Sequence, residues 1–144
     1  AVENTCAPES PAAAAAAQEL KGEGNDAFKA KQYKEAVDAY TAAIKLDGTD
    51  AVFWSNRSAC WLELNEPQRA LADAEQCRRL RPTWAKACYR MAAARLALKL
   101  YEDSALAAFE GLKLDDKNES LKKIMNKAVE LGREAHKAKQ GTGE

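Results

Sequence analysis

Apolar residues return along this chain with the three-to-four-residue spacing of α-helices, and the pattern itself repeats every 34 residues. Runs rich in Ala, Leu, Lys and Glu begin at Ala17, Ala51 and Ala85. The twentieth position of each unit is occupied by a small residue: Ala36, Ala70 and Ser104. Small residues at fixed places allow paired helices to approach closely, and no segment alternates like a β-strand over a useful length. The pattern therefore predicts a repeated, purely helical unit.

Each unit is expected to contain two helices, because a stretch that reverses the chain lies near its middle. These stretches are residues 30–33, 64–67 and 99–102. Pro67 suits the first turn of a helix, where a missing N–H costs no hydrogen bond, and Pro82 disfavours helical geometry in the residue before it. A last amphipathic helix, from residue 118 to about 139, carries Leu121, Ile124, Met125, Ala128, Val129 and Leu131. Such a helix covers the apolar face that the last pair would otherwise expose.

The predicted fold is all-α: a right-handed α-solenoid of three helix pairs with a C-terminal capping helix. The units span residues 17–50, 51–84 and 85–118, and the capping helix spans 119–139, so the domain covers 17–139. Residues 1–16 have no apolar stripe, and we expect a flexible tail whose alanines are able to extend the first helix by a turn or two. Residues 140–144 are expected to be disordered. A start without Met and the ending Gly-Thr-Gly-Glu predict a fragment of a longer protein.

Composition and charge argue against several classes of function. The chain is 47% hydrophobic, and its zero net charge divides into −4 over residues 1–50, +2 over 51–118 and +2 over 119–144. No block of basic charge suits a nucleic-acid backbone, no run of 18 apolar residues encodes a membrane span, and the first residues do not resemble a secretory signal. With one histidine, His136, and no paired nucleophile and base, we expect no enzyme and no cofactor.

The four cysteines are Cys6, Cys60, Cys77 and Cys88. No two have C-x-x-C spacing, so no metal site is expected. The last three fall within predicted helices, where a free thiol behaves as a small apolar residue. Reduced thiols predict a cytoplasmic location, with the nucleus or the cytosolic face of an organelle as alternatives. We expect a monomer.

The first helix of each unit has two distinct faces. At 100° per residue, positions 2, 5, 6 and 9 of a unit share one face, and positions 4, 7, 8 and 11 lie opposite. The opposite face carries core residues such as Trp54 and Trp61. Arg57 and Arg95 also fall there, and we expect their stems to pack while the guanidinium groups reach solvent. First helices line the inner wall of a solenoid, so the face of positions 2, 5, 6 and 9 is the expected binding surface.

Five polar residues from the three units meet on this inner face: Lys21, Asn25, Asn56, Lys86 and Arg90. Lysine and arginine offer only donors, and each asparagine amide adds two more. Because no acidic residue accompanies them, the set favours an anion with several acceptor oxygens, such as a carboxylate. Each charge-assisted bond contributes about 1.5–3 kcal/mol when it is well made. Less polar residues of the same face are expected to form a peptide groove: Phe28, Val52, Ala59, Tyr89 and Ala93.

From residue 17 to about 136 the sequence resembles tetratricopeptide-repeat co-chaperones of the carboxylate-clamp class. The period of 34 residues is that of tetratricopeptide repeats, and the resemblance rests on residues 20–29 (LKGEGNDAFK), 55–59 (SNRSA) and 86–90 (KACYR). It implies that the five polar residues grip both carboxylates of a C-terminal aspartate. The implied partner is the Glu-Glu-Val-Asp tail of cytosolic chaperones of the Hsp90 and Hsp70 classes. Gly48 and Asp116 replace the proline usual at the end of a repeat, which loosens a turn and leaves the clamp positions intact.

Two alternative functions remain open at the level of sequence. The domain is either a general scaffold that binds an internal peptide or another protein, or the targeting module of a larger enzyme. Binding to a peptide with a blocked C-terminus would favour the scaffold. The clamp residues do not choose between the two chaperone classes, because they would contact the part of the tail that both classes share.

Overall fold

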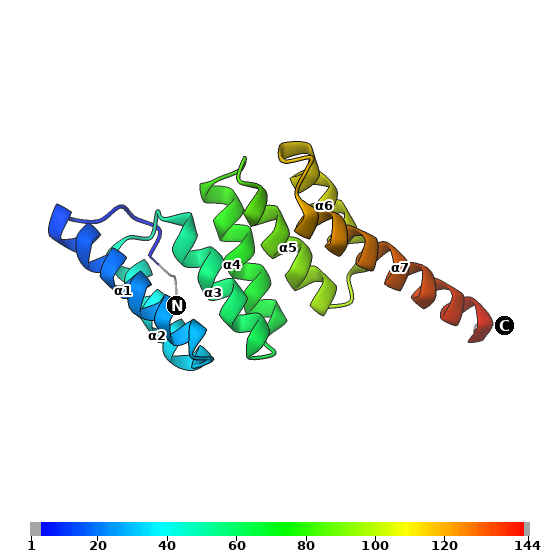
Figure 1. Cartoon of the computed structure of the whole chain (residues 1–144), viewed down its shortest axis with the longest axis horizontal. Helices are drawn as coiled ribbons and strands as arrows, with labels where there is room; N and C mark the ends of the chain where they lie inside the picture. The colour runs from blue at the N-terminus through cyan, green and yellow to red at the C-terminus, as the bar shows by residue number, and fades with distance from the viewer. Residues whose placement is uncertain (1–3, 143–144) are drawn as a thin grey trace.

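The computed structural model describes residues 4–142, which form seven α-helices and no β-strand. The helices are α1 (Pro11–Lys29), α2 (Tyr33–Leu46), α3 (Ala51–Glu63), α4 (Pro67–Leu80), α5 (Ala85–Ala97), α6 (Tyr101–Leu114) and α7 (Glu119–Thr142). Figure 1 shows them stacked in chain order along the long axis of the molecule. The all-α solenoid predicted from the repeat is confirmed, with α3 and α5 beginning at the predicted alanines.

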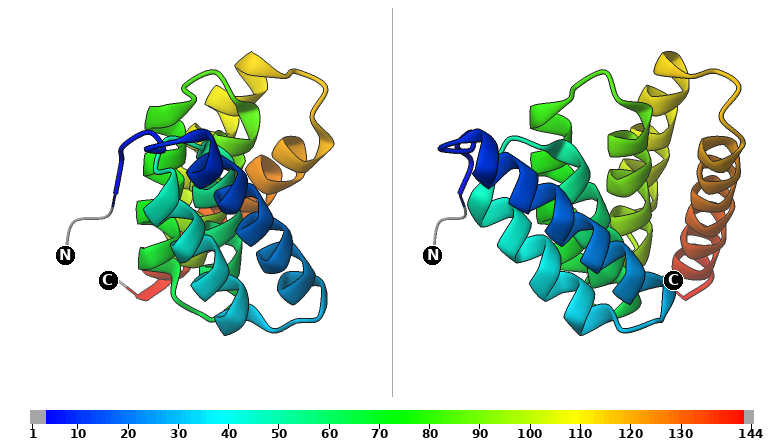
Figure 2. Two further views of the ribbon diagram at one scale, coloured as in Figure 1. Left: turned by 90° about the vertical axis from the view of Figure 1, so that its left-hand side faces the viewer. Right: turned by 60° about the vertical axis from the view of Figure 1, so that its left-hand side comes forward.

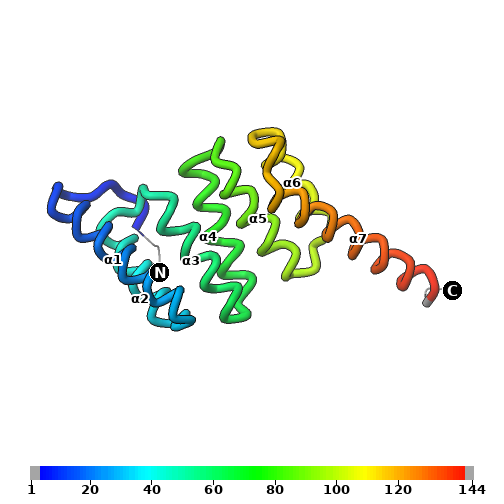
Figure 3. Tube along the Cα trace, in the orientation of Figure 1, coloured from blue at the N-terminus to red at the C-terminus, as the bar shows by residue number. Residues whose placement is uncertain are grey.

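Consecutive helices form three antiparallel pairs, α1–α2, α3–α4 and α5–α6, and α7 packs against α6 (Figures 1 and 2). The first helices of neighbouring pairs also touch, α1 with α3 and α3 with α5. The first helices of the three repeats therefore make one continuous wall. The trace in Figure 3 shows α7 continuing past the other helices toward the C-terminus.

The turn inside each pair has the same backbone geometry in all three repeats. Lys31, Asn65 and Lys99 adopt left-handed φ angles of 61°, 58° and 64°. In each turn the N–H of the next residue bonds to a carbonyl five residues back, as Gln32 does to Ala27 over 2.8 Å. This is the bonding of a Schellman motif, which satisfies carbonyls at a helix end. The predicted midpoints of the three units are therefore correct, and the 34-residue period extends to the backbone conformation.

Small residues lie where the helices of a pair come closest. A Cβ added to Gly24 of α1 would lie 2.5 Å from the Tyr40 ring of α2. A Cβ added to Gly111 of α6 would lie 2.9 Å from Leu121 of α7 and from Cys88 of α5. The third repeat and the capping helix thus share one core, which contains Ala92, Ala108 and Leu121 with no exposed surface. This packing agrees with the predicted role of α7 as a cap.

The structure defines the two ends of the domain. The alanines before residue 17 extend the first helix back to Pro11, within the expected turn or two, because Ser10 caps the helix by accepting from Ala13 N and Pro11 suits the first turn. Before it, the Asn4 side chain donates to the carbonyls of Ile44 and Lys45 over 3.1 and 3.0 Å. At the other end α7 stays helical through residue 142, so residues 140–142 are not disordered. Residues 1–3 and 143–144 of the two expected tails lie outside the described residues.

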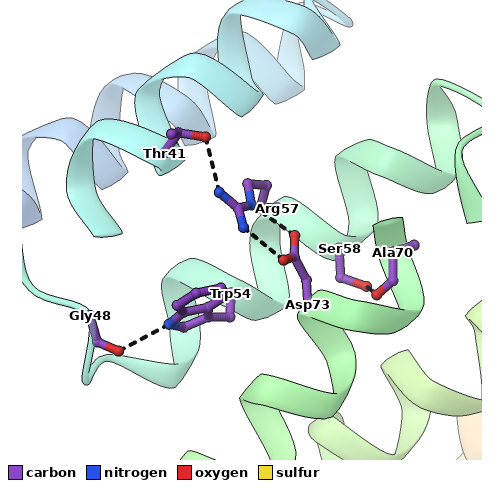
Figure 4. A network of polar contacts seen from close by, with 7 residues as sticks. All are labelled: Thr41, Gly48, Trp54, Arg57, Ser58, Ala70 and Asp73. Atoms are coloured by element: carbon purple, nitrogen blue, oxygen red, sulfur yellow. Dashed lines mark hydrogen bonds and ion pairs between the residues drawn. The ribbon is translucent and has the colours of Figure 1, made fainter. Parts of the chain in front are cut away.

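The expectation that the Arg57 guanidinium reaches solvent is wrong. Arg57 is 4% exposed, and it donates to both carboxylate oxygens of Asp73 and to Thr41 Oγ1 (Figure 4). The partly buried Arg95 donates instead to the carbonyl of Asp103. An apolar helix face tolerates Arg57 because a buried carboxylate meets it there.

Cys60, Cys77 and Cys88 are buried, as predicted, and Cys6 is exposed. None of the seven described helices is both long enough and apolar enough to cross a membrane. Within residues 4–142 no cluster of three or more His, Cys, Asp or Glu side chains is placed to hold a metal ion.

Candidate functional site: a pocket between three repeats

Helices α1, α3 and α5 bring three of the five predicted polar residues to one pocket. This pocket of about 210 Å³ is lined by Asn25, Phe28, Lys29, Tyr40, Asn56, Ala59 and Arg90. Asn25, Asn56 and Arg90 come from the first helices of the first, second and third repeats. Phe28 and Ala59 of the predicted groove also line it. The pocket therefore lies where the helical-wheel analysis placed the binding surface.

The two asparagines share a hydrogen-bond network with a tyrosine beneath them. Tyr40 Oη donates to Asn25 Oδ1 over 2.6 Å, and Asn56 Nδ2 donates to the same oxygen over 3.2 Å. Asn25 Oδ1 is thereby occupied by two donors, and its amide nitrogen remains available to a ligand. Asn56 keeps a second N–H. The asparagines consequently present donors to the pocket.

Arg90 lines the same pocket and is held by a residue of α3. Its Nε donates to Ser55 Oγ over 3.1 Å, and its guanidinium lies 5.8 Å from the centre of the Tyr89 ring. Burial is the main reason why the pKa of Arg90 is lowered. An arginine nevertheless stays protonated at neutral pH. Arg90 thus supplies a permanent positive charge whose terminal N–H groups are not used by Ser55.

The structure does not place Lys21 and Lys86 in the lining of the pocket. Each lies four residues before a polar residue of the pocket on the same helix, Lys21 before Asn25 and Lys86 before Arg90, so each pair shares a helix face. Lys21 is partly buried and Lys86 is exposed, and neither forms an ion pair within residues 4–142. Loss of hydration against the protein, and then the positive charge of Arg90, lower the pKa of Lys86. Each lysine is therefore one helical turn away from a residue of the pocket.

The remaining groove residues lie outside the pocket. Val52, Tyr89 and Ala93 are partly buried, and none of them lines it. Tyr89 and Ala93 pack against the core that the third repeat shares with α7. Their role in a peptide groove remains a prediction.

Sequence analysis missed three residues of the site: Lys29, Tyr40 and Ser55. Lys29 lines the pocket. It lies four residues after Asn25, as Asn25 lies four residues after Lys21, and this spacing could have identified it from the sequence. Tyr40 is on the second helix of its pair, and only the packing of α2 against α1 brings it to the site. Ser55 precedes Asn56 in sequence, but its bond to Arg90 spans two repeats.

The charged side chains that line the pocket are all positive. Its lining contains two cations and two amides, and no acidic residue. A larger cavity of about 690 Å³ lies between α6 and α7, but it is lined by Glu102 and Asp103 as well as by Arg133. Of these two sites, the smaller pocket joins residues from all three repeats and has no carboxylate in its lining. It is suited to bind an anion.

Comparison with known proteins identifies the repeat. A family model described as "Serine/threonine-protein kinase BSK1-like, TPR repeats" matches residues 11–92, more than half of the chain. The chain belongs to the tetratricopeptide repeat (TPR) family. The TPR match begins at the residue where α1 begins and ends within α5.

Individual relatives and solved structures are TPR proteins of the co-chaperone type. The chain is 44% identical over 105 residues to the "Heat shock protein sti1 homolog" of Schizosaccharomyces pombe, a match that covers 73% of this chain and 18% of that protein. It is similar, with a TM-score of 0.79 and 29% identity, to the first TPR of Spaghetti (RPAP3) bound to the HSP90 peptide SRMEEVD, covering 81% of this chain and 93% of that one. It is also similar, with a TM-score of 0.75 and 26% identity, to the second TPR domain of human RPAP3 in complex with the HSP70 peptide SGPTIEEVD, covering 81% and 95%. The TPR chain thus spans about a fifth of its relative and nearly the whole of each solved domain.

Proposed function

We propose that this TPR domain binds the C-terminal Glu-Glu-Val-Asp tail of Hsp90- and Hsp70-class chaperones. In this proposal Asn25, Asn56 and Arg90 hold the two carboxylates of the terminal aspartate from the pocket. Lys21 and Lys86 bind the same two carboxylates from the edge of the pocket. The domain is a binding module in the cytosol, and it performs no chemical step.

The convergence of donors from three repeats carries the proposal. Asn25, Asn56 and Arg90 surround one pocket, and no acidic side chain lines it. A charge-assisted hydrogen bond contributes about 1.5–3 kcal/mol, so four or five such bonds outweigh the cost of ordering a short peptide. The pocket wall formed by Phe28 and Ala59 offers apolar surface to the residue that precedes the aspartate.

The peptides in the similar structures support the same ligand. When SRMEEVD and SGPTIEEVD are aligned at their C-termini, they share the last four residues and differ at every position before them. A site that grips the terminal aspartate would accept both. Preference for one chaperone class would then depend on contacts with the upstream residues, for which Val52, Tyr89 and Ala93 are the candidates on the inner face.

The competing function is a scaffold for an internal peptide or a folded partner. The free α-carboxylate distinguishes the two, because only a clamp needs it. We would titrate the domain with SRMEEVD as the free acid and as the C-terminal amide, by calorimetry. The clamp predicts at least a tenfold loss of affinity on amidation, or about 1.4 kcal/mol. Equal affinities would overturn the clamp and favour the scaffold.

A further inference from the structure

Two buried hydroxyl groups lie directly behind the donors of the pocket. Tyr40 is 1% exposed and bonds to Asn25, and Ser55 is 0% exposed and bonds to Arg90. Tyr40 comes from the second helix of the first repeat, and Ser55 comes from the repeat before that of Arg90. Each hydroxyl therefore ties a ligand-binding side chain to an element other than its own helix.

We propose that Tyr40 and Ser55 are positioning residues of the clamp, which fix the direction in which Asn25 and Arg90 present their donors. This proposal rests on the proposed function, and it concerns how the site discriminates an anion. Neither residue needs to contact the carboxylates. Each acts through the side chain that it holds.

The role of Tyr40 follows from the two ends of an asparagine amide. An amide turned by 180° presents a carbonyl oxygen where it had presented an NH₂ group. Burial above all, and then the Cys60 thiol, raise the pKa of Tyr40 to about 12, so the phenol keeps its proton at neutral pH. That proton is donated to Asn25 Oδ1, which turns the amide nitrogen away from Tyr40. Without the hydroxyl, only the longer 3.2 Å bond from Asn56 Nδ2 holds Asn25 Oδ1, so the amide turns its oxygen more readily toward the ligand, where it would repel a carboxylate.

The role of Ser55 follows from the geometry of the guanidinium. Arg90 has five N–H groups in a rigid plane, and Ser55 accepts from the one on Nε. That bond uses the Nε edge of the guanidinium and leaves its far edge, with one N–H from each terminal nitrogen, unused by Ser55. Since a carboxylate binds best to two parallel N–H groups, a fixed plane favours a bidentate bond over a loose charge contact.

The test compares each hydroxyl deletion in two backgrounds, with the free-acid peptide SRMEEVD as the probe. Tyr40→Phe is measured in the wild type and in Asn25→Ala, and Ser55→Ala in the wild type and in Arg90→Lys, which keeps the charge but has no Nε. We expect each deletion to weaken binding about fivefold in the wild type and less than twofold in the second background. Circular dichroism first establishes a temperature at which every variant is folded.

Matched controls separate positioning from general loosening of the fold. Ser58 is on the same helix as Ser55, is equally buried, and donates to the carbonyl of Ala70 away from the pocket. Tyr101 lies on α6 and lines a different cavity. Ser58→Ala and Tyr101→Phe should change affinity less than twofold, even where Ser58→Ala lowers the melting temperature as much as Ser55→Ala does.

The outcomes distinguish this inference from the function on which it rests. If the wild type binds free-acid and amidated peptide equally, the clamp itself fails. If the wild type discriminates the two while Tyr40→Phe and Ser55→Ala bind as tightly as the wild type, the clamp stands and positioning is overturned. The same follows if each deletion costs as much in the second background as in the first, because its effect would then not pass through Asn25 or Arg90.

Discussion

Arg57 and Asp73 form a bidentate ion pair inside the second repeat. Arg57 Nε and Nη2 donate to Asp73 Oδ2 and Oδ1, each over 2.8 Å (Figure 4). Both side chains are 5% exposed. The third arm of the guanidinium reaches Thr41 Oγ1 of the first repeat over 3.1 Å. One buried pair thus joins α3 to α4 and the second repeat to the first.

Removing the carboxylate of this pair should destabilise the domain strongly. In Asp73→Leu the Arg57 charge stays in a low-dielectric interior without its carboxylate, which costs about 3–5 kcal/mol. Replacing both residues, as in Arg57→Leu with Asp73→Leu, should cost less than the single change, since no charge is then buried. Chemical denaturation, followed by circular dichroism, measures both free energies of unfolding.

A surface pair of the same length provides the control. Arg78 Nη2 lies 2.8 Å from Glu110 Oε2, but these side chains are 27% and 32% exposed. Glu110→Ala should cost less than about 1 kcal/mol, because solvent screens the pair. If Asp73→Leu costs no more than Glu110→Ala, the internal pair does not have the structural role described here.

Arg57 also shows where prediction from sequence stops. Its position on the face of Trp54 and Trp61 was evident from the helical period. Its partner was not, because Asp73 lies 16 residues away on another helix and only the packing of α3 on α4 brings the two together. Helical periodicity predicts which face a residue occupies, and tertiary contacts decide what it meets there.

The same distinction applies to the helices. The 34-residue period placed the starts of α3 and α5 and the three left-handed turns correctly, because these features recur in every repeat. The ends of the domain do not recur. The early start of α1 depends on the cap at Ser10, and the length of α7 depends on a polar helical run that has no counterpart in the repeats.

For the site, the shared helix face was enough to bring Asn25, Asn56 and Arg90 together. It was not enough to find Tyr40, which reaches the pocket from α2, or to separate the lining residues from Lys21 and Lys86, which do not line it. Those details depend on helix-pair geometry and side-chain conformation.

The capping helix should contribute to stability without contributing to binding. Leu121 is fully buried against the core of the third repeat, so Leu121→Ala removes apolar contacts and leaves a cavity, at a cost of about 2–5 kcal/mol. Val129→Ala, at a residue of the same helix that is 39% exposed, should cost much less. Thermal unfolding measures stability, and peptide titration of the folded variant should give an unchanged affinity. A loss of affinity in folded Leu121→Ala would show that α7 shapes the binding surface.

The buried thiols should be unreactive and should make the fold sensitive to alkali. Burial raises the pKa of Cys60 and of Cys77 to about 12. Below pH 9 both thiols are protonated in the folded and unfolded states alike, so they do not affect stability there. Above pH 9 the unfolded thiols ionise while the folded ones keep their protons, so stability should fall as the pH rises from about 9 toward 12.

Labelling with a thiol reagent tests the burial directly. In the native domain at pH 8 only the exposed Cys6 should react rapidly, and Cys60, Cys77 and Cys88 should react after denaturant is added. Cys6→Ser should abolish the rapid phase. A rapid phase that persists in Cys6→Ser would place a second thiol at the surface, contrary to the structure.

The cations of the clamp should determine binding without determining stability. Lys86→Ala and Arg90→Ala should each weaken binding of SRMEEVD by about 2 kcal/mol, because each leaves a carboxylate without a charged partner. Lys86 is exposed, so its loss should hardly change the free energy of unfolding, whereas Arg90→Ala also loses the bond to Ser55 and should cost about 1 kcal/mol.

Lys127→Ala and Arg133→Ala remove the same charges from exposed positions on α7, and they should leave affinity unchanged. Raising the salt concentration should weaken peptide binding by the wild type more than binding by Arg90→Ala, because salt screens charge pairs and the variant has one charge fewer to pair with the peptide. Equal affinity losses in the clamp and α7 variants would mean that the peptide senses only the overall charge of the domain.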